Sequence, residues 1–216
     1  AGAGTGKTRV LTTRIAHILL QKKAFPGQVL SVTFTNKAAG EMRERVEHLL
    51  GLGAADDHPS NLSGLWMGTF HSIGAKILRR HADVLGFTAQ FTILDADDQH
   101  RLVKQIMAEQ GIDNAKVAGK VILSIIQGWK DKGLTPDKLS RDIAGDEGAG
   151  AMAAKLYPIY QYRLKTLNAV DFGDLLLHCL TLFTTHQHIL NEYAQRFHYI
   201  LVDEYQDTNV AQYLWL

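Results

Sequence analysis

The first eight residues, AGAGTGKT (Ala1–Thr8), decide the fold class. They fit the phosphate-loop pattern G-x-x-x-x-G-K-[S/T], with Ala1 at the first glycine position and Gly6-Lys7-Thr8 closing it. Glycines let the backbone curl so that its N–H groups point at phosphate oxygens, and the N-terminus of a following helix adds positive partial charge. A Gly/Ala-rich turn before a helix is the alternative, but a complete GKT ending is uncommon by chance. We therefore expect a nucleotide-binding loop.

The side chains of this loop have separate expected roles. Lys7 carries a charge that can reach the β- and γ-phosphates, and the Thr8 hydroxyl can bind Mg²⁺. The predicted nucleotide-binding residues of the loop are Ala1, Gly2, Ala3, Gly4, Thr5, Gly6, Lys7 and Thr8. The pattern thus predicts ATP and Mg²⁺ as ligands.

A nucleotide site of this kind also needs an acid at the end of a neighbouring strand. Near the other end of the chain, Ile200-Leu201-Val202 runs directly into Asp203 and Glu204. We expect Asp203 to hold Mg²⁺, directly or through water, and Glu204 to orient or deprotonate the water that attacks the γ-phosphate. Two acids after a strand are weak evidence alone, because solvated strand ends often look like this. Together with GKT they form two halves of one ATPase site.

Hydrophobic spacing predicts strands and helices in alternation at both ends of the chain. Strands are expected over residues 29–34, 65–70 and 199–204, and helices over 9–22, 36–50, from residue 71 through His81, and 171–185. Between about Asp95 and Leu167 only helical patterns occur; Asp95 is placed to cap a helix over 98–110, and Pro158 should kink or end the helix that it interrupts. Alternation at the ends favours an α/β fold with a parallel sheet, interrupted by an all-helical insertion.

Composition sets broad limits on location and partners. The chain has 216 residues, 46% hydrophobic and 21% charged, as in ordinary globular domains, and no apolar run approaches the length of a membrane helix. Cys179 is the only cysteine, which excludes intrachain disulfides and favours a reducing, cytoplasmic location. Residues 1–50 hold eight Lys/Arg and three Glu, 8 − 3 = +5, a weak indication of a polyanionic partner.

Five motifs in a fixed order carry a family resemblance. The chain contains AGAGTGKTRVLTTRI, VTFTNKAAGEMRER, GTFHS, DFGDLL and ILVDEYQDTN in that order. These motifs resemble those of UvrD/PcrA/Rep-type superfamily 1 DNA helicases, and the resemblance covers residues 1–216. The resemblance implies a RecA-like P-loop NTPase domain that moves 3′→5′ on single-stranded DNA, meets duplex junctions, and serves DNA repair or replication. It also implies that Gln206 senses the γ-phosphate and couples it to DNA, and that Arg9 packs against the adenine.

The same resemblance suggests domain bounds. Residues 1–85 and 165–216 would form the RecA-like ATP-binding domain, and residues 86–164 the helical insertion. Incompleteness is expected at both ends, since the strand before the phosphate loop and the second RecA-like domain would lie outside this chain. That second domain supplies arginines, which raise the rate of hydrolysis by about 10³–10⁵-fold in comparable enzymes. The parent is therefore expected to be an ATP hydrolase, and this chain alone to hydrolyse ATP negligibly.

Two strand ends carry side chains suited to DNA, because ligands of α/β sheets bind at the carboxyl ends of strands. An exposed Phe34 could stack on a base, although a core role is equally consistent with the pattern. Residues 35–37 could meet phosphates, and the helix that follows GTF has an N-terminus suited to them. By the resemblance, Thr69 and His71 lie in a DNA-contacting motif. The predicted DNA-binding residues are Phe34, Thr35, Asn36, Lys37, Thr69 and His71.

Two further groups have an open interpretation. Trp129-Lys130 with Lys132 could present an aromatic–basic patch to DNA, but helical packing explains Trp129 at least as well. The acids of DFGDLL, Asp171 and Asp174, are predicted to be structural rather than catalytic. Gly173 between them stands where the resemblance leads us to expect an acid.

Three other functions compete with a helicase motor. The motor of a helicase–nuclease recombination subunit shares these motifs and differs only in a downstream nuclease domain. A non-hydrolysing DNA-binding module is disfavoured because Lys7, Thr8, Asp203, Glu204 and Gln206 are all intact. Small P-loop kinases are disfavoured because they lack the TFTNKAA and DEYQ segments. The sequence names no protein partner.

Overall fold

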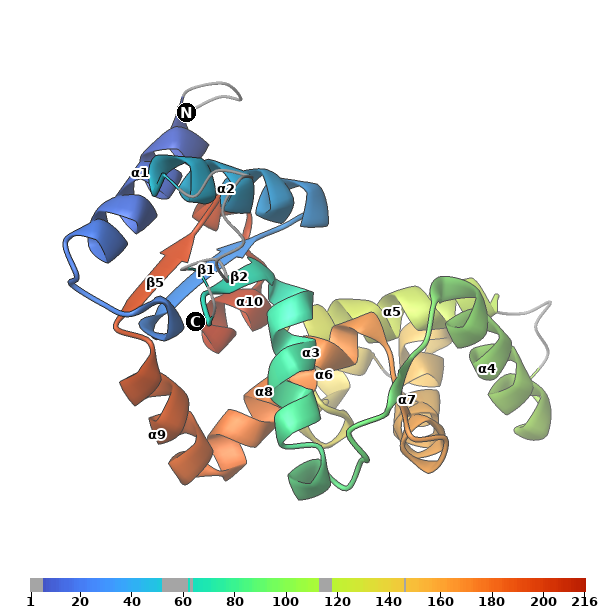
Figure 1. Ribbon diagram of the computed structural model, residues 1–216. Helices are drawn as coiled ribbons and strands as arrows, with labels where there is room; N and C mark the ends of the chain where they lie inside the picture. Colours follow the sequence, from blue (N-terminus) through green and yellow to red (C-terminus); the bar gives the residue numbers. More distant parts are fainter. Residues whose placement is uncertain (1–5, 52–61, 63, 113–117, 146) are drawn as a thin grey trace. The chain divides into compact units, whose positions relative to one another are not determined.

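The computed structural model describes residues 6–51, 62, 64–112, 118–145 and 147–216. Residues 1–5 of the phosphate loop, Ala1, Gly2, Ala3, Gly4 and Thr5, therefore lie outside the described residues. The chain divides into two compact units, Ala1–Ile73 with His186–Thr208, and Gly74–Thr185 with Asn209–Leu216 (Figure 1). These bounds differ from the predicted domain bounds, since residues 74–85, 165–185 and 209–216 group with the helical part.

The first unit is built on a parallel sheet, as predicted. Strands β1 (Val29–Thr33), β2 (Trp66–Thr69) and β5 (Tyr199–Val202) lie in the order β2-β1-β5. Both pairings are parallel, and all five residues of the central strand β1 are buried, as is usual for a strand covered on both faces.

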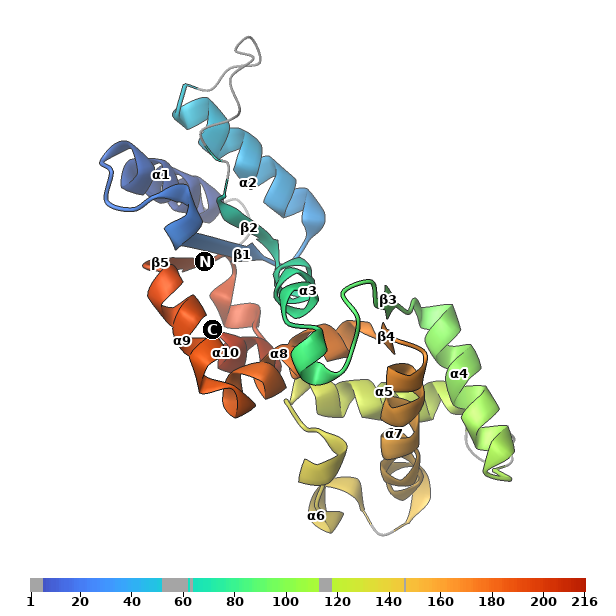
Figure 2. The same ribbon diagram turned by 60° about the horizontal axis from the view of Figure 1, so that its bottom comes forward.

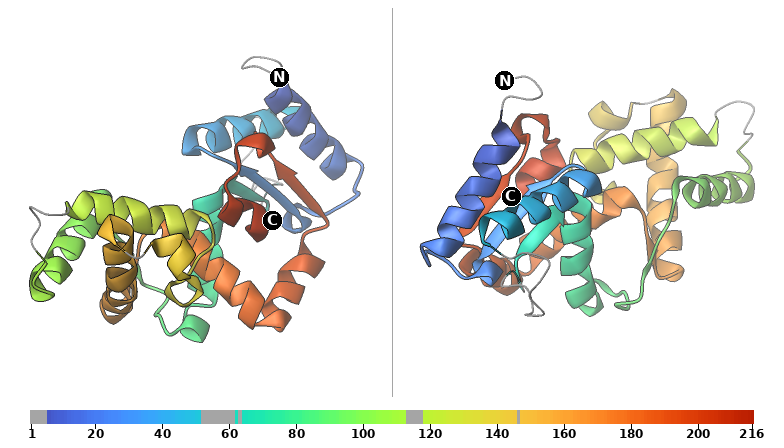
Figure 3. Two further views of the ribbon diagram at one scale, coloured as in Figure 1. Left: turned by 180° about the vertical axis from the view of Figure 1, so that it is seen from behind. Right: turned by 45° about the horizontal axis from the view of Figure 1, so that its top comes forward.

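Helices α1 (Lys7–Leu20) and α2 (Asn36–Leu49) lie side by side over this sheet (Figure 1, Figure 3). Their buried side chains Ile15, Ile18 and Val46 form one hydrophobic cluster with Val29 and Leu201 of the sheet. Helix α9 (Gln187–Arg196) leads into β5. Burial of this apolar face is what fixes α1 and its N-terminus against the strands.

The second unit is helical. Its main helices are α4 (Ala96–Glu109), α5 (Gly119–Asp131), α7 (Gly148–Thr166), α8 (Phe172–Thr185) and α10 (Val210–Trp215), with a short α6 (Arg141–Ala144), and it takes the larger part of α3 (Phe70–Arg80). The predicted cap of α4 is confirmed, since the Asp95 carboxylate accepts a hydrogen bond of 2.8 Å from the Asp98 amide. No described helix is both long enough and apolar enough to span a bilayer.

Two short strands join the ends of the helical segment and were not predicted. β3 (Thr92–Ile93) pairs in parallel with β4 (Ala169–Val170), just before α4 and just after α7 (Figure 2). Asn168 holds this junction, because its side chain accepts from the Thr88 amide at 2.8 Å and donates to the Thr88 hydroxyl at 2.7 Å. Strands of two residues are too short to leave a periodic signal in the sequence.

Helix α7 does not end at Pro158. It continues to Thr166, although the proline removes one backbone donor. Tyr157 and Tyr160, on either side of the proline, are fully buried, while Pro158 itself is exposed. Packing on both sides of the interruption thus outweighs the lost hydrogen bond.

Candidate nucleotide site and strand-end interface

The predicted site residues that directly follow the strands of the first unit lie at one edge of its sheet. Parallel strands end on the same side, and the register aligns Thr33 with Thr69 and Val32 with Val202. The residues that follow these strands, including Phe34 and Asp203, therefore start from the same edge, which is where α/β sheets bind ligands.

The two halves of the predicted ATPase site are in direct contact. Gly6 has a left-handed backbone (φ 80°), which a glycine adopts without steric cost and which lets the chain turn into α1. One residue later, Lys7 Nζ donates a hydrogen bond of 2.9 Å to Glu204 Oε2. The partners are 197 residues apart in sequence and 31% and 39% exposed. The end of the phosphate loop and the acids after β5 thus converge.

Glu204 is held in an unusual conformation beside this contact. Its backbone is left-handed (φ 51°, ψ 43°), which is unfavourable for a residue with a Cβ and is typical of functional sites. Gln206, in the short helix η4 (Tyr205–Asp207), donates to the same Oε2 atom. Hydrogen bonds from Lys7 and Gln206 lower the pKa of Glu204, so the group is a carboxylate.

Asp203 is less accessible than its neighbour. Its amide donates a hydrogen bond of 2.9 Å to Val32 O and so continues the β5–β1 ladder. The residue is only 8% exposed. Burial raises the pKa of Asp203, and the adjacent Glu204 charge raises it further. A nearly buried carboxylate next to a second one favours a bound cation.

The residues present fit a magnesium ion. Thr8 lies in the first turn of α1, next to Lys7, and a hydroxyl and a carboxylate are the hard oxygen ligands that Mg²⁺ prefers. Within the described ranges no cluster of three or more His, Cys, Asp or Glu could hold a metal by itself. Mg²⁺ usually needs no such cluster, since it takes one or two protein ligands together with water and substrate phosphates.

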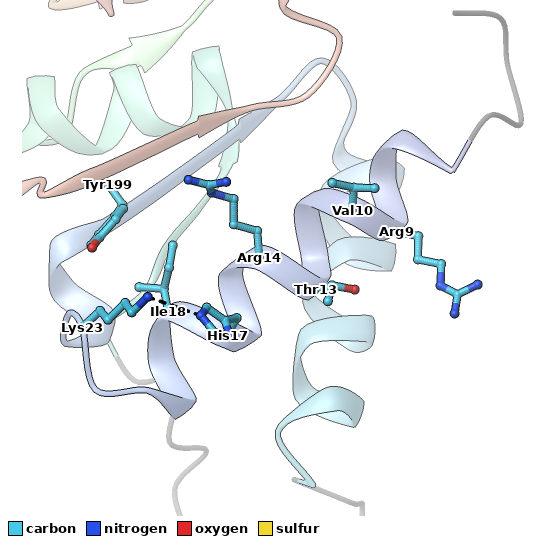
Figure 4. Close-up of a pocket in the computed structure, with 8 residues that line it drawn as sticks. All are labelled: Arg9, Val10, Thr13, Arg14, His17, Ile18, Lys23 and Tyr199. Atoms are coloured by element: carbon cyan, nitrogen blue, oxygen red, sulfur yellow. Dashed lines mark hydrogen bonds between the residues drawn. The ribbon is translucent and has the colours of Figure 1, made fainter.

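Arg9 borders a cavity between α1 and the edge strand β5. The cavity has a volume of about 680 Å³ and is lined by Arg9, Val10, Thr13, Arg14, His17, Ile18, Lys23 and Tyr199. Figure 4 shows Arg14 reaching toward β5, with Lys23 and His17 in contact at the far end of the helix. Arg9 is exposed, so its planar guanidinium is accessible to an aromatic base.

The predicted DNA-binding residues at the end of β1 divide into supporting and accessible ones. The Phe34 ring is half-buried, with its centroid 5.7 Å from that of Phe70. Thr35 caps α2, since its hydroxyl accepts from the Ala38 amide at 3.1 Å. Asn36 and Lys37 are exposed, and Lys37 Nζ lies 4.0 Å from Glu41 in a surface pair of little energetic weight.

At the end of β2, Thr69 is buried and its hydroxyl accepts from the Ser72 amide at 3.1 Å. This bond caps the first turn of α3, where His71 is half-buried. Thr69 thus supports the turn, and His71 remains the more accessible candidate contact.

The proposed aromatic–basic patch in the insertion is wrong for two of its three members. Trp129 and Lys130 are 5% and 1% exposed, because their face of α5 packs into the helical core; only Lys132 is exposed.

Sequence reasoning also overlooked the cavity residues Arg14 and Tyr199. A signal existed for Arg14, since it follows Val10 by one helical turn on the same face of α1.

Comparisons with known proteins bear on this arrangement. The family model described as UvrD/REP helicase N-terminal domain matches residues 1–216. A protein named "Probable DNA helicase II homolog" from Rickettsia felis is 50% identical over 100% of this chain and 32% of its own length. "ATP-dependent DNA helicase PcrA" of Bacillus subtilis is 42% identical over 99% of this chain and 28% of its own length. PcrA of Leuconostoc citreum is 41% identical over 99% of this chain and 27% of its own length. The chain thus spans about a third or less of these relatives.

Proposed function

Because the chain belongs to the UvrD/REP helicase N-terminal domain family, we propose that it is motor-domain sequence of an ATP-dependent DNA helicase. The helicase would move 3′→5′ on single-stranded DNA and act at duplex junctions in repair or replication. The contact between Lys7 and Glu204 carries the proposal, since it brings a phosphate-binding cation to a candidate general base. Relatives named as ATP-dependent DNA helicases support it.

We propose that residues 1–8 hold the triphosphate, with Arg9 against the adenine. Mg²⁺, held by Thr8 and Asp203, would neutralise phosphate charge. When Lys7 turns to the phosphates, Glu204 loses one of the two donors that lower its pKa and becomes a better base for the attacking water. Gln206, which already donates a hydrogen bond to Glu204, would sense the γ-phosphate and couple its presence to DNA.

The domain division remains part of the proposal. Residues 1–85 and 165–216 would be the RecA-like ATP-binding domain, and residues 86–164 its insertion. Support comes from β3 and β4, which bring the two ends of the helical segment together as an insertion requires.

A strand-displacement assay tests the function and its direction. The protein, with its native flanking sequence, is given duplexes that carry either a 3′ or a 5′ single-stranded tail. We expect ATP-dependent displacement from the 3′-tailed duplex alone, and none with EDTA. Displacement from the 5′-tailed duplex would contradict the direction, while DNA binding without displacement or hydrolysis would favour a non-hydrolysing module. Degradation of the displaced strand would indicate the helicase–nuclease alternative.

Phe34→Ala tests the strand-end interface. Loss of one base stack should weaken single-strand binding by about 1–3 kcal/mol, or roughly 5- to 150-fold in Kd. Fluorescence anisotropy at matched salt measures the effect, since phosphate contacts make affinity salt-dependent. Phe25→Ala is the control, because Phe25 is 77% exposed before the opposite end of β1. Equal affinity of the Phe34 variant and wild type would assign Phe34 to the core alone.

A further inference from the structure

The second unit contains ionisable side chains that have no access to solvent. The side chains of Lys130, near the end of α5, and of Asp171 and Asp174, at the start of α8, are all 0% exposed. None of the roles proposed above uses them. Burial of a charge is costly unless the charge is paired and hydrogen-bonded, so their environment must compensate.

Lys130 bridges the two carboxylates. Its Nζ atom lies 2.7 Å from Asp171 Oδ2 and 2.7 Å from Asp174 Oδ1. Burial alone would raise the pKa of Asp174, but the Lys130 ammonium, the nearby His178 and the hydrogen bonds from Lys130 and the Asp171 amide together outweigh it and leave that pKa at about 2. Burial and the neighbouring Asp174 charge raise the pKa of Asp171. The cation is thus the counter-ion for both acids.

Helices α5 and α7 supply further donors to the same carboxylates. From α5, Gln127 Nε2 donates to Asp171 Oδ2 at 2.8 Å. From α7, the Tyr160 hydroxyl donates to Asp171 Oδ2 at 3.0 Å, and Gln161 Nε2 donates to Asp174 Oδ1 at 2.9 Å. The network therefore connects α5, α7 and α8.

The remaining carboxylate oxygens cap α8. The Asp174 amide donates to Asp171 Oδ1 at 2.9 Å, and the Asp171 amide donates to Asp174 Oδ2 at 3.1 Å. All four carboxylate oxygens thus accept hydrogen bonds, at the positive end of the α8 dipole. The acids of DFGDLL are structural, as predicted.

Gly173 explains how the lysine comes so close. A Cβ atom at this position would lie 2.6 Å from Gln127 Oε1 and 2.8 Å from Lys130 Cδ. A side chain at residue 173 would therefore have to displace the side chains of Gln127 and Lys130. An acid here, which the resemblance led us to expect, would displace the stem of Lys130.

From these contacts we propose that Lys130 is the buried counter-ion of a charge-dependent lock. Its ammonium holds Asp171 and Asp174 at the start of α8 and, through them, fixes α5 and α7 against α8 in one register. The lock is independent of the function proposed above, because none of its members has a role in that function.

Lys130→Met tests the lock in the protein with its native flanking sequence. Methionine keeps most of the stem but leaves two buried carboxylates without a cation. Amide hydrogen exchange, which needs neither ATP nor DNA, should show protection in α5 and α8 falling by about 100-fold or more. The control is Lys132→Met, the same change at an exposed position two residues later, where protection should stay at the wild-type level.

A triple variant separates charge from packing. Lys130→Met with Asp171→Asn and Asp174→Asn removes every charge of the network, while asparagine oxygens can still cap α8. This variant should fold and regain most of the lost protection, even if Lys130→Met alone fails to fold. Wild-type protection in Lys130→Met, or a triple variant that is as unprotected as the single one or unfolded, would overturn the lock.

Discussion

Replacement of Lys7 by alanine is expected to abolish DNA-stimulated ATP hydrolysis, with kcat lowered by at least about 10²–10³-fold. Preorganised charges that stabilise the charge developing in a transition state have effects of this size when one is removed. Lys7 is the cation that follows Gly6 at the start of α1, where the backbone and the helix dipole also favour phosphate. Steady-state phosphate release with saturating single-stranded DNA, from the protein with its native flanking sequence, measures the loss.

Lys120→Ala is the matched control for this prediction. Lys120 also follows a glycine in the first turn of a helix, α5, and it is exposed. Its variant should hydrolyse ATP at the wild-type rate. If Lys7→Ala retained wild-type turnover, Lys7 would have no part in the reaction.

Glu204→Gln should lose hydrolysis to a similar extent while retaining nucleotide binding. Glutamine has nearly the volume of glutamate and can still accept a hydrogen bond from Lys7, but it cannot take a proton from water. General-base catalysis contributes about 10²–10⁴-fold, and a loss of that size is expected in kcat. Quenched-flow measurement of a single turnover, with a fluorescent ATP analogue to check binding, separates the two effects.

Glu192→Gln makes the same change at an exposed glutamate of α9 and should leave the rate unchanged. Hydrolysis by the Glu204 variant at the rate of this control would exclude Glu204 as the base. Loss of nucleotide binding in the Glu204 variant would instead assign the residue to binding.

The sheet was predictable because its strands carry strong local signals. β1 and β5 are apolar runs that end in polar residues, and β2 is followed at once by a helix pattern. The parallel arrangement followed from the alternation of strands with helices. β3 and β4 left no comparable signal, and the effect of Pro158 depended on the burial of Tyr157 and Tyr160, which a local pattern does not reveal.

The candidate site was predictable in composition but not in geometry. The GKT ending and the two acids after β5 indicated partners that the structure brings together through the Lys7–Glu204 contact. Nothing in the sequence marked the left-handed backbone of Glu204. The burial of Lys130 was hidden as well, because lysine is rarely buried and its partners lie on another helix.

The most direct test is a crystal structure of the protein with Mg²⁺ and a non-hydrolysable ATP analogue. We expect one bound triphosphate, with its terminal phosphates on the Lys7 ammonium and its metal bonded to the Thr8 hydroxyl and reached by Asp203, directly or through water. A triphosphate bound away from both Lys7 and Asp203 would contradict a shared ATPase site at this sheet edge.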